Sequence, residues 1–389
     1  MSYHLTYLEA VVTGLVQGVT ELFPISSLGH NVLLPALIGG SWANALNVSA
    51  PGSPYLAFIV GLHVATAVAM IAYFWRDWLR IAAGFLSSLR RRSATTPDER
   101  LAWMIILGTI PVGIVGVALQ KVFTNVFAKP ELAAVFLAVN GVILLLSERM
   151  RRARLGARGA ATAAVPSVPP RGPVPGRPDP GRPAGRPGPD GYSQQPWQQQ
   201  QQGPGGNGRP GNGRGQYGQQ PEQYGRVPGR HAAGQAPGGQ APGGQVPAAA
   251  AADPAVAADR RLSTMDYRQA VIVGGAQILA LLPGISRDGM VTVAGMWRGL
   301  RREDAVRFSF LLSAPVILAA GVLKVPDLTG PMTKGMHGPV LVGSLIAGVA
   351  AFLSVRFLTK YFSEDKSLNP FGIYCLVAGL GSLAYLAIK

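Results

Sequence analysis

The chain has 389 residues, of which 48% are hydrophobic and 14% are charged, and its formal net charge is +16. This composition, with long apolar runs, excludes an ordinary water-soluble domain and indicates an integral membrane protein. The charge does not indicate nucleic-acid binding, because residues 149–261 alone hold 15 arginines against 5 acidic residues, a surplus of 10.

The first apolar segment ends in a polar run instead of continuing across a membrane. Pro24 cannot continue a helix, and Ser26 and Gly29 favour turns and helix starts. We therefore predict a helix over residues 5–23, a break at 24–29 and a short helix over 30–38. Because a bilayer crossing takes about 20 apolar residues, the two arms are predicted to form a re-entrant hairpin.

The rest of the chain alternates predicted spans with polar stretches. After the hairpin we expect a loop at 39–53, spans at 55–75, 101–119 and 132–146, and a surface segment at 81–89. Residues 156–258 are rich in Pro, Gly, Gln and Ala and hold few large apolar residues, so we predict a disordered tether. A second hairpin is expected at 266–297, followed by spans at 305–323, 339–357 and 371–388. The predicted domains are a first membrane repeat (1–150), a cytoplasmic insert (151–261) and a second membrane repeat (262–389).

The two hairpins repeat one another. An offset of 260 positions aligns residues 10–30 with 270–290 without a gap, and it pairs Gly14 with Gly274, Gln17 with Gln277 and Ser26 with Ser286. Three spans separate the hairpins, and three is an odd number, so they must open to opposite sides of the membrane. The predicted fold is therefore an all-α integral membrane protein with an inverted repeat, each half being a re-entrant helical hairpin plus three transmembrane helices.

The distribution of arginine predicts the orientation. Residues 76–100 hold six arginines, whereas residues 31–54 hold no Lys or Arg. Because positive loops stay in the cytoplasm, we expect a multi-pass protein of the bacterial plasma membrane whose first hairpin opens to the extracytoplasmic side.

The first break carries residues suited to phosphate chemistry. Gln17 and Glu21 share a helix face, and the carboxylate could ligate a hard divalent cation or act as a general base. Ser26 and Ser27 stand near a helix start, where free amides favour a phosphate. Ser27 is a candidate nucleophile, and His30, one turn later, could activate it, protonate the leaving group or itself accept the phosphoryl group.

The second break contributes a positively charged side chain. Arg287 offers a fork of donors matched to phosphate, and Ser286 adds a hydroxyl. Together the two breaks suit phosphoryl transfer from an anionic lipid-linked substrate.

Each of these residues also has a structural interpretation. Ser26 is better explained as a helix cap and His63 as a packing residue. Gln17 and Gln277 fit interhelical hydrogen bonding and a role in the site equally well. Arg287 alone could simply pair with Glu21 or Asp288.

These motifs resemble a known family. The pair Gln17 and Glu21, the run PISSLGH ending at His30, and the run PGISRDG around Arg287 are similar to signature motifs of the undecaprenyl-diphosphate phosphatase family linked to bacitracin resistance. The resemblance covers both membrane halves and leaves out the insert. It implies an enzyme that removes the terminal phosphate of undecaprenyl diphosphate, so that the lipid carrier can be reused for peptidoglycan.

The resemblance also implies roles for individual residues. Glu21 and Gln17 would belong to an acidic motif with a divalent cation, Mg²⁺ or Ca²⁺. The catalytic residues implied are Glu21, Ser27, His30 and Arg287, and the phosphate-binding residues Ser26, Gly29, Ser286 and Arg287. The chain departs from the family's usual hydroxyl residues at three positions, which hold Leu28, Asp288 and Val291. Asp288 would bring a negative charge near the site or orient Arg287.

Two other functions compete with the phosphatase. Inverted repeats with broken helices also occur in transporters, so a non-catalytic flippase of undecaprenyl phosphate is the alternative. A scaffold that recruits envelope enzymes through the insert is a weaker third. The expected partners are undecaprenyl diphosphate and membrane lipids, with a homodimer left open.

Overall fold

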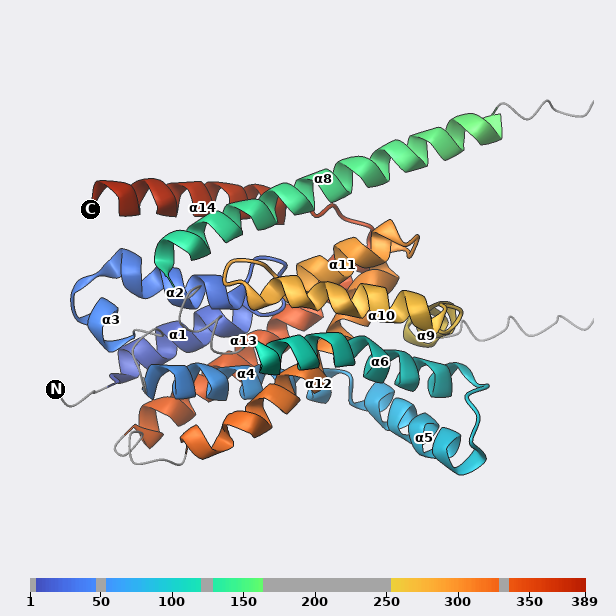
Figure 1. Cartoon of the computed structure of the whole chain (residues 1–389), viewed down its shortest axis with the longest axis horizontal. Helices are drawn as coiled ribbons and strands as arrows, with labels where there is room; N and C mark the ends of the chain where they lie inside the picture. The colour runs from blue at the N-terminus through green and yellow to red at the C-terminus, as the bar shows by residue number, and fades with distance from the viewer. Residues whose placement is uncertain (1–4, 47–53, 120–128, 164–252, 329–335) are drawn as a thin grey trace, which may run out of the picture. The chain divides into compact units, whose positions relative to one another are not determined.

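The computed structural model describes residues 5–46, 54–119, 129–163, 253–328 and 336–389, and all regular structure in these residues is helical. One compact unit, Met1–Val165 with Pro247–Lys389, contains the described parts of both membrane halves. Figure 1 shows most of its helices running along a common direction.

The first hairpin is present, with its break earlier than expected. Helix α1 (Tyr7–Thr20) starts at a capping box in which Thr6 and Glu9 bond each other's backbone amides. Helix α2 (Ser27–Ile38) starts three residues before the predicted His30, because the Ser26 side chain accepts the Gly29 amide and caps it. The break therefore covers residues 21–26 instead of 24–29.

The remaining helices of the first half follow the predicted order. A short helix α3 (Gly40–Ala45) occupies part of the expected loop, whose residues 47–53 lie outside the described residues. The others are α4 (Pro54–Tyr73), α5 (Trp75–Arg91), α6 (Pro97–Ala118) and α8 (Pro130–Ala163). The chain turns by 86° between α4 and α5, so the helix around the predicted surface segment leaves the direction of the span before it.

The second half repeats this order. A short helix α9 (Pro254–Ser263) precedes the second hairpin, which consists of α10 (Tyr267–Gly275), the 3₁₀ helix η1 (Ala276–Leu281) and α11 (Arg287–Trp297). The spans that follow are α12 (Arg302–Leu328), α13 (His337–Ser363) and α14 (Asn369–Ile388).

The insert is shorter than predicted. Residues 151–163 continue α8, and Pro254–Ser263 form α9, so both ends of the predicted insert 151–261 are helical. An α-helix can form without large apolar residues. Composition alone therefore placed the two boundaries of the insert too far apart. Residues 164–252 lie outside the described residues.

Five helices of the described chain are long and apolar enough to cross a membrane, namely α6, α8, α12, α13 and α14. The bent pair α4 and α5 makes up to a sixth. The protein is therefore an all-helical, multi-pass membrane protein.

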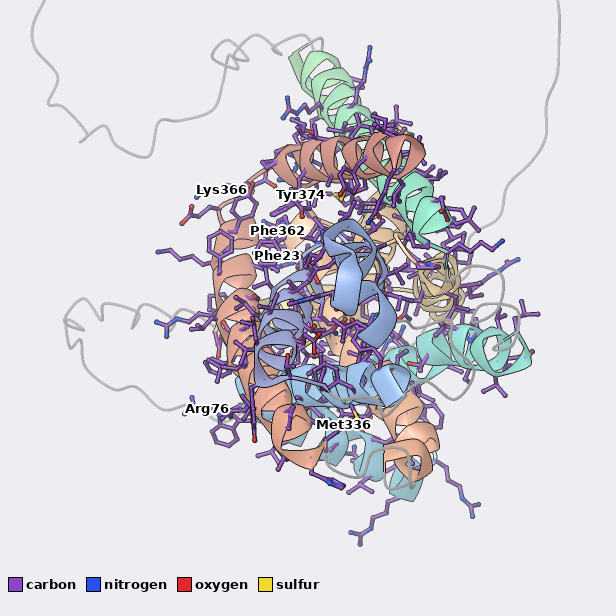
Figure 2. All side chains as sticks on the ribbon, turned by 90° about the vertical axis from the view of Figure 1, so that its left-hand side faces the viewer. Phe23, Arg76, Met336, Phe362, Lys366 and Tyr374 are labelled. Carbon is purple, nitrogen blue, oxygen red and sulfur yellow. The ribbon has the colours of Figure 1, made fainter. Side chains whose placement is uncertain are left out.

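Helices of each half pack against helices of the other half. Helix α1 packs on α13 of the other half, and α10 packs on α6. At each contact glycine faces glycine, because a Cβ on Gly14 would overlap the Gly343 carbonyl oxygen and a Cβ on Gly274 would overlap that of Gly108. In the end-on view of Figure 2, the Arg76 and Lys366 side chains point outward from this bundle.

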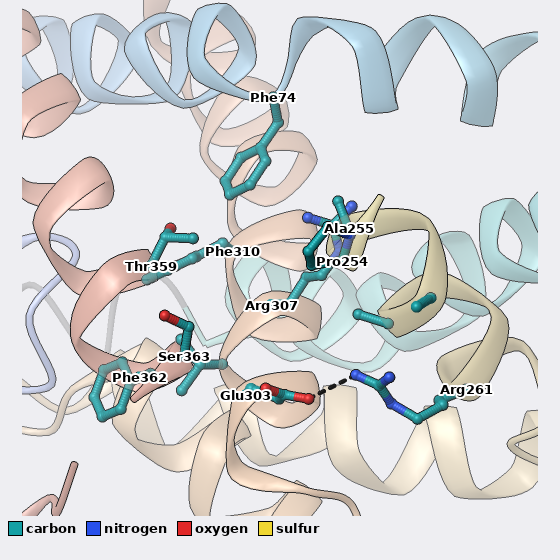
Figure 3. Close-up of a pocket in the computed structure, with 13 residues that line it drawn as sticks. Phe74, Pro254, Ala255, Arg261, Glu303, Arg307, Phe310, Thr359, Phe362 and Ser363 are labelled. Atoms are coloured by element: carbon teal, nitrogen blue, oxygen red, sulfur yellow. Dashed lines mark hydrogen bonds and ion pairs between the residues drawn. The ribbon is translucent and has the colours of Figure 1, made fainter. Parts of the chain in front are cut away.

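Helix α9 is fixed to the end of the bundle by buried charges. Asp259, 1% exposed, accepts two hydrogen bonds from Arg307 (2.7 and 2.9 Å) and pairs with Arg80. Arg261 pairs with Glu303 at 2.7 Å (Figure 3). A mainly apolar cavity of about 200 Å³ lies between α9, α12 and α13. The end of the insert is therefore part of the folded bundle.

Candidate active site

The two helix breaks touch one another. Ser26 Oγ, from the first break, accepts the backbone amide of Gly284 in the second at 3.1 Å, and Ser286 Oγ donates to the Phe23 carbonyl at 3.5 Å. A Cβ on Gly29 would lie 2.8 Å from the Gly284 Cα, so glycine is needed there for the close approach. The expectation that residues 260 positions apart meet at one site is correct for these breaks.

Ser26 has a backbone conformation that is unusual for a residue with a side chain. Its φ is 69°, in the left-handed region, and its Oγ accepts the amides of both Gly29 and Gly284. Such strain persists only where surrounding contacts enforce it, and it is frequent at functional sites. The structure therefore uses Ser26 as a helix cap and as a bridge between the breaks.

Glu21 is the centre of the polar cluster. Its side chain is 3% exposed and lies at the end of α1, one turn after Gln17, whose Nε2 donates to Glu21 Oε2 at 2.7 Å. Ser27 Oγ donates to the same oxygen, and Arg287 Nη2 pairs with Oε1. One buried carboxylate thus joins a hydroxyl of its own hairpin to a guanidinium of the other.

His63 completes the cluster, although the sequence favoured a packing role for it. Its Nε2 lies 3.3 Å from Glu21 Oε2, and its Nδ1 lies 2.8 Å from the Ile59 carbonyl oxygen. A carbonyl oxygen only accepts, so Nδ1 must carry a proton. The contact between Nε2 and the carboxylate is then favourable only when a second proton lies between them, which makes this pair a place where a proton can be held.

These groups line one small cavity of about 150 Å³. Its walls include Glu21, Ser26, Ser27, His63, Gln277, Ser286 and Arg287, with apolar residues that include Leu28, Val112 and Val316. Two polar atoms of the walls, Arg287 Nε and Gln277 Oε1, are buried without a hydrogen-bond partner among the described residues. Buried polar groups without partners are rare, and a donor of this kind fits an anionic ligand.

His30 lies outside this cluster. Its Nδ1 is 2.7 Å from the Ser26 carbonyl oxygen, and its Nε2 is 2.8 Å from the Tyr374 hydroxyl on α14. The two rings also stack, with centroids 5.7 Å apart. Among the described contacts none joins His30 to Ser27, so the structure does not bring the expected serine–histidine pair together.

The two predicted metal ligands do not fit a cation as they are arranged. Gln17 turns its amide nitrogen toward Glu21, while its oxygen accepts from Asn31 at 2.6 Å. Both carboxylate oxygens of Glu21 already contact hydrogen-bond donors. One donor is the positively charged Arg287, and another is His63, which is charged when protonated. No group of three or more His, Cys, Asp or Glu residues in the described part of the chain could hold a metal ion.

The Asp288 carboxylate turns to α12, but its charge lies near the site, as expected, within electrostatic reach of Arg287 and Glu21. Its Oδ1 accepts hydrogen bonds of 2.6 Å from Ser309 and Ser313 on α12, and the residue is 3% exposed. The departure from a serine at this position therefore adds a contact between α11 and α12. It adds no hydrogen bond to Arg287.

Two asparagines that no sequence motif identifies support the site. Asn31 orients Gln17, and Asn140 on α8 bonds both breaks. Both are fully buried amides inside apolar helices. An amide side chain within an apolar helix is the one sequence feature that could have identified Asn31 and Asn140 as residues of the site.

Comparisons with known proteins identify the family of the chain. The family model described as "Bacitracin resistance protein BacA" matches residues 10–165 and 246–381. The chain is 47% identical over 389 residues, all of both chains, to "Undecaprenyl-diphosphatase" of Mycolicibacterium paratuberculosis. It is 47% identical over 385 residues, 97% of each chain, to "Undecaprenyl-diphosphatase 2" of Frankia alni. A relative with the latter name in Burkholderia orbicola is 32% identical over 378 residues, 97% of this chain and 96% of its own.

Proposed function

The chain belongs to the bacitracin resistance protein BacA family, and we infer from this membership and from the site that it is an undecaprenyl-diphosphatase. It hydrolyses undecaprenyl diphosphate to undecaprenyl phosphate and inorganic phosphate. The reaction returns the lipid carrier to cell-envelope synthesis. The observation that carries the assignment is the contact of Glu21 with both Ser27 and Arg287 in one buried cavity.

We propose that Ser27 is the nucleophile. Glu21 accepts the proton of the Ser27 hydroxyl as Oγ bonds to the terminal phosphorus. The bond from phosphorus to the bridging oxygen breaks, and undecaprenyl phosphate leaves with the electron pair. Water then attacks the phosphoserine, releases inorganic phosphate and restores the hydroxyl. Arg287, with its free Nε, would neutralise the phosphoryl oxygens through both steps.

We assign the proton relay to His63 in place of His30. The contact of His63 Nε2 with Glu21 supports this role, because the protonated imidazole can give a proton to the leaving group and then take up the proton that Glu21 received from Ser27. His30, bonded to Ser26 and Tyr374, would instead hold the first break in its conformation. Phosphate contacts from Ser26, Gly29 and Ser286 remain proposals that follow from the motif.

A requirement for a divalent cation also remains a proposal. When bound, Mg²⁺ or Ca²⁺ would neutralise the diphosphate. Gln17 and Glu21 do not offer free oxygens in their present arrangement, so we derive no step from such an ion.

We further propose that the two halves are an inverted repeat. The exchanged packing of α1 on α13 and of α10 on α6 supports this, as do the two glycine pairs, because Gly14 and Gly274 are equivalent in the repeat. An active site that opens to the extracytoplasmic side follows from the arginine distribution and stays a proposal, as does a homodimer.

The test is phosphate release by the purified full-length protein supplied with undecaprenyl diphosphate and magnesium. Removal of the nucleophile in Ser27→Ala is expected to lower kcat by on the order of 10³. Arg287→Gln is expected to lower kcat/KM strongly, whereas Arg298→Gln, which changes an exposed arginine at the other end of α11, should match the wild type. Full activity of Ser27→Ala would disprove the assignment of the nucleophile. Translocation of undecaprenyl phosphate without phosphate release would support the flippase instead.

A further inference from the structure

A third cavity, of about 350 Å³, lies away from the active site and is lined with arginine. Its walls come from the end of α8, from residues 296–303 at the junction of α11 and α12, and from the end of α13. Four arginines and two carboxylates line it, namely Arg151, Arg154, Arg301, Arg302, Glu303 and Asp365. The cavity therefore carries a surplus of positive charge.

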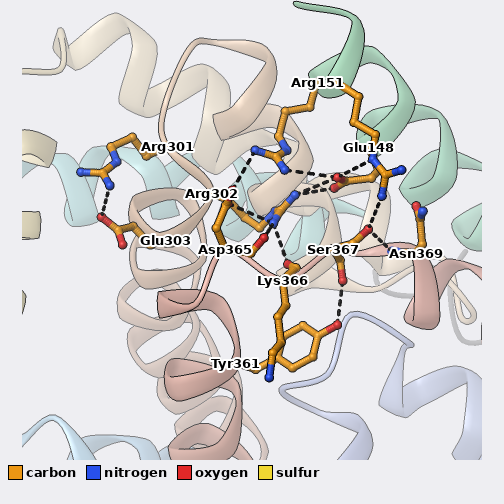
Figure 4. Close-up of polar contacts among 11 residues, drawn as sticks. Glu148, Arg151, Arg301, Arg302, Glu303, Tyr361, Asp365, Lys366, Ser367 and Asn369 are labelled. Carbon is orange, nitrogen blue, oxygen red and sulfur yellow. Dashed lines mark hydrogen bonds and ion pairs between the residues drawn. The ribbon is translucent and has the colours of Figure 1, made fainter. Parts of the chain in front are cut away.

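The carboxylates near the cavity do not satisfy every hydrogen-bond donor of its arginines. Figure 4 shows Arg151 and Arg302 converging on Glu148, which is not one of the residues that line the cavity. Arg302 also donates to the backbone oxygens of Asp365 and Lys366, at 2.5 and 2.6 Å. Even so, Arg302 Nε has no partner among the described residues, although its side chain is 0% exposed, and Arg151 Nε is also buried and unpartnered. One fully buried arginine and one that is 24% exposed thus each keep a buried nitrogen without a described partner at this cavity.

The backbone adds to this preference for an anion. Helix α12 starts at Arg302, and its first residues, Arg302 and Glu303, line the cavity. The amides and dipole at a helix N-terminus favour a phosphate.

The cavity lies where lipid headgroups are expected. A crossing takes about 20 residues, so the span that starts at Pro130 reaches the membrane surface near Met150, next to Arg151 and Arg154. Arg154 donates to the carbonyl of Trp297 (3.2 Å), a tryptophan 47% exposed, as is common at the interface. Leu155, also on the wall, is 50% exposed and extends the lining toward the apolar region.

We propose that this cavity binds the phosphate of an anionic phospholipid from the membrane leaflet at the arginine-rich end of the bundle. The donors fit a phosphate, and the exposed apolar residues beside them fit acyl chains, which inorganic phosphate lacks. A lipid bound here contacts α8 of the first half together with α12 and α13 of the second. A bound lipid therefore links the two halves of the protein. It does so at the end of the bundle opposite the C-terminal ends of α2 and α14.

The experiment measures thermal unfolding of the full-length protein in neutral detergent during titration with short-chain phosphatidylglycerol. Phosphatidylcholine of the same chain length and inorganic phosphate are titrated in parallel. The proposal expects a saturable rise in Tm with phosphatidylglycerol, because a ligand of the folded state stabilises it. The variant Arg154→Gln/Arg301→Gln should lose roughly tenfold or more in apparent affinity, since it removes two charged donors. Both residues are exposed, so the variant is expected to fold.

The matched control is Arg152→Gln/Arg298→Gln, which removes the same charge from the same two segments. Arg152 and Arg298 do not line the cavity, and this variant should keep the wild-type titration. An equal response to phosphatidylcholine, or equal affinity losses in both variants, would overturn the proposal. A rise produced by inorganic phosphate and lost in Arg154→Gln/Arg301→Gln would keep the phosphate site but overturn the lipid as its source.

Discussion

The amide oxygen of Asn140 accepts a hydrogen bond of 3.1 Å from the backbone nitrogen of Ser286. The nitrogen of the same side chain donates to the Pro24 carbonyl at 2.9 Å. One residue of α8 therefore satisfies a backbone group of each break. Backbone left free by a broken helix has to be satisfied inside a membrane protein, and here Asn140 does so for both hairpins at once.

Asn140→Leu is therefore expected to lower both stability and activity. It leaves the Pro24 carbonyl and the Ser286 amide without this partner in a buried site, at about 1–3 kcal/mol for each group. Thermal unfolding and phosphate release of the purified variant check this. The control is Ser147→Ala on the same helix, whose hydroxyl is buried without a hydrogen-bond partner in the described structure and should be dispensable. Equal effects of the two substitutions would show that the hydrogen bonds of Asn140 do not matter.

His63→Ala is expected to lower kcat by roughly 10²-fold, because general acid–base catalysis contributes about that factor. His63→Gln keeps a donor toward Glu21 but cannot pass a proton on, so it should retain substrate affinity and lose kcat as His63→Ala does. The measurement is kcat and KM for both variants. His337→Gln, at the exposed start of α13, serves as the control. A kcat of His63→Gln equal to that of the wild type would remove His63 from the proton path.

Gly14→Ala and Gly274→Ala are each expected to destabilise the protein by about 1–3 kcal/mol, because the new methyl group has to displace backbone of the opposite half. Gly113→Ala in α6 is the control, since nothing lies within 4 Å of its new Cβ. That change should be neutral or stabilising by up to about 1 kcal/mol, because alanine favours helix. Thermal unfolding of the three variants compares them. Similar Tm values would contradict the close contact of the halves.

Deletion of residues 164–252 should leave turnover within about twofold, because all side chains of the proposed site lie outside this segment. A deletion extended through residue 261 should instead destabilise the protein. It removes Asp259 and Arg261, and so leaves Arg307, 11% exposed, with Asp77 as its remaining acidic partner. Steady-state activity and unfolding temperature of both deletions test this. A loss of activity in the shorter deletion would show that the insert does more than connect the two halves.

The sequence by itself determined the parts that depend on local pattern. Apolar runs predicted the spans, proline with serine and glycine predicted both breaks, and the 260-residue offset indicated that the two hairpins are similar. The spans and the breaks depend on hydrogen bonding and hydrophobicity within one segment, so they can be predicted from neighbouring residues. The motifs likewise identified Glu21, Ser27 and Arg287 as residues that belong together.

Only the tertiary structure decided which side chains meet. His30 is three residues from Ser27, yet α2 turns it to Tyr374, while His63 arrives from α4 to contact Glu21. Asn140 carries no motif, and Asp288 turns to α12 instead of the cavity. Such contacts depend on the rotation and spacing of packed helices. Residue types along one helix restrict these variables only weakly.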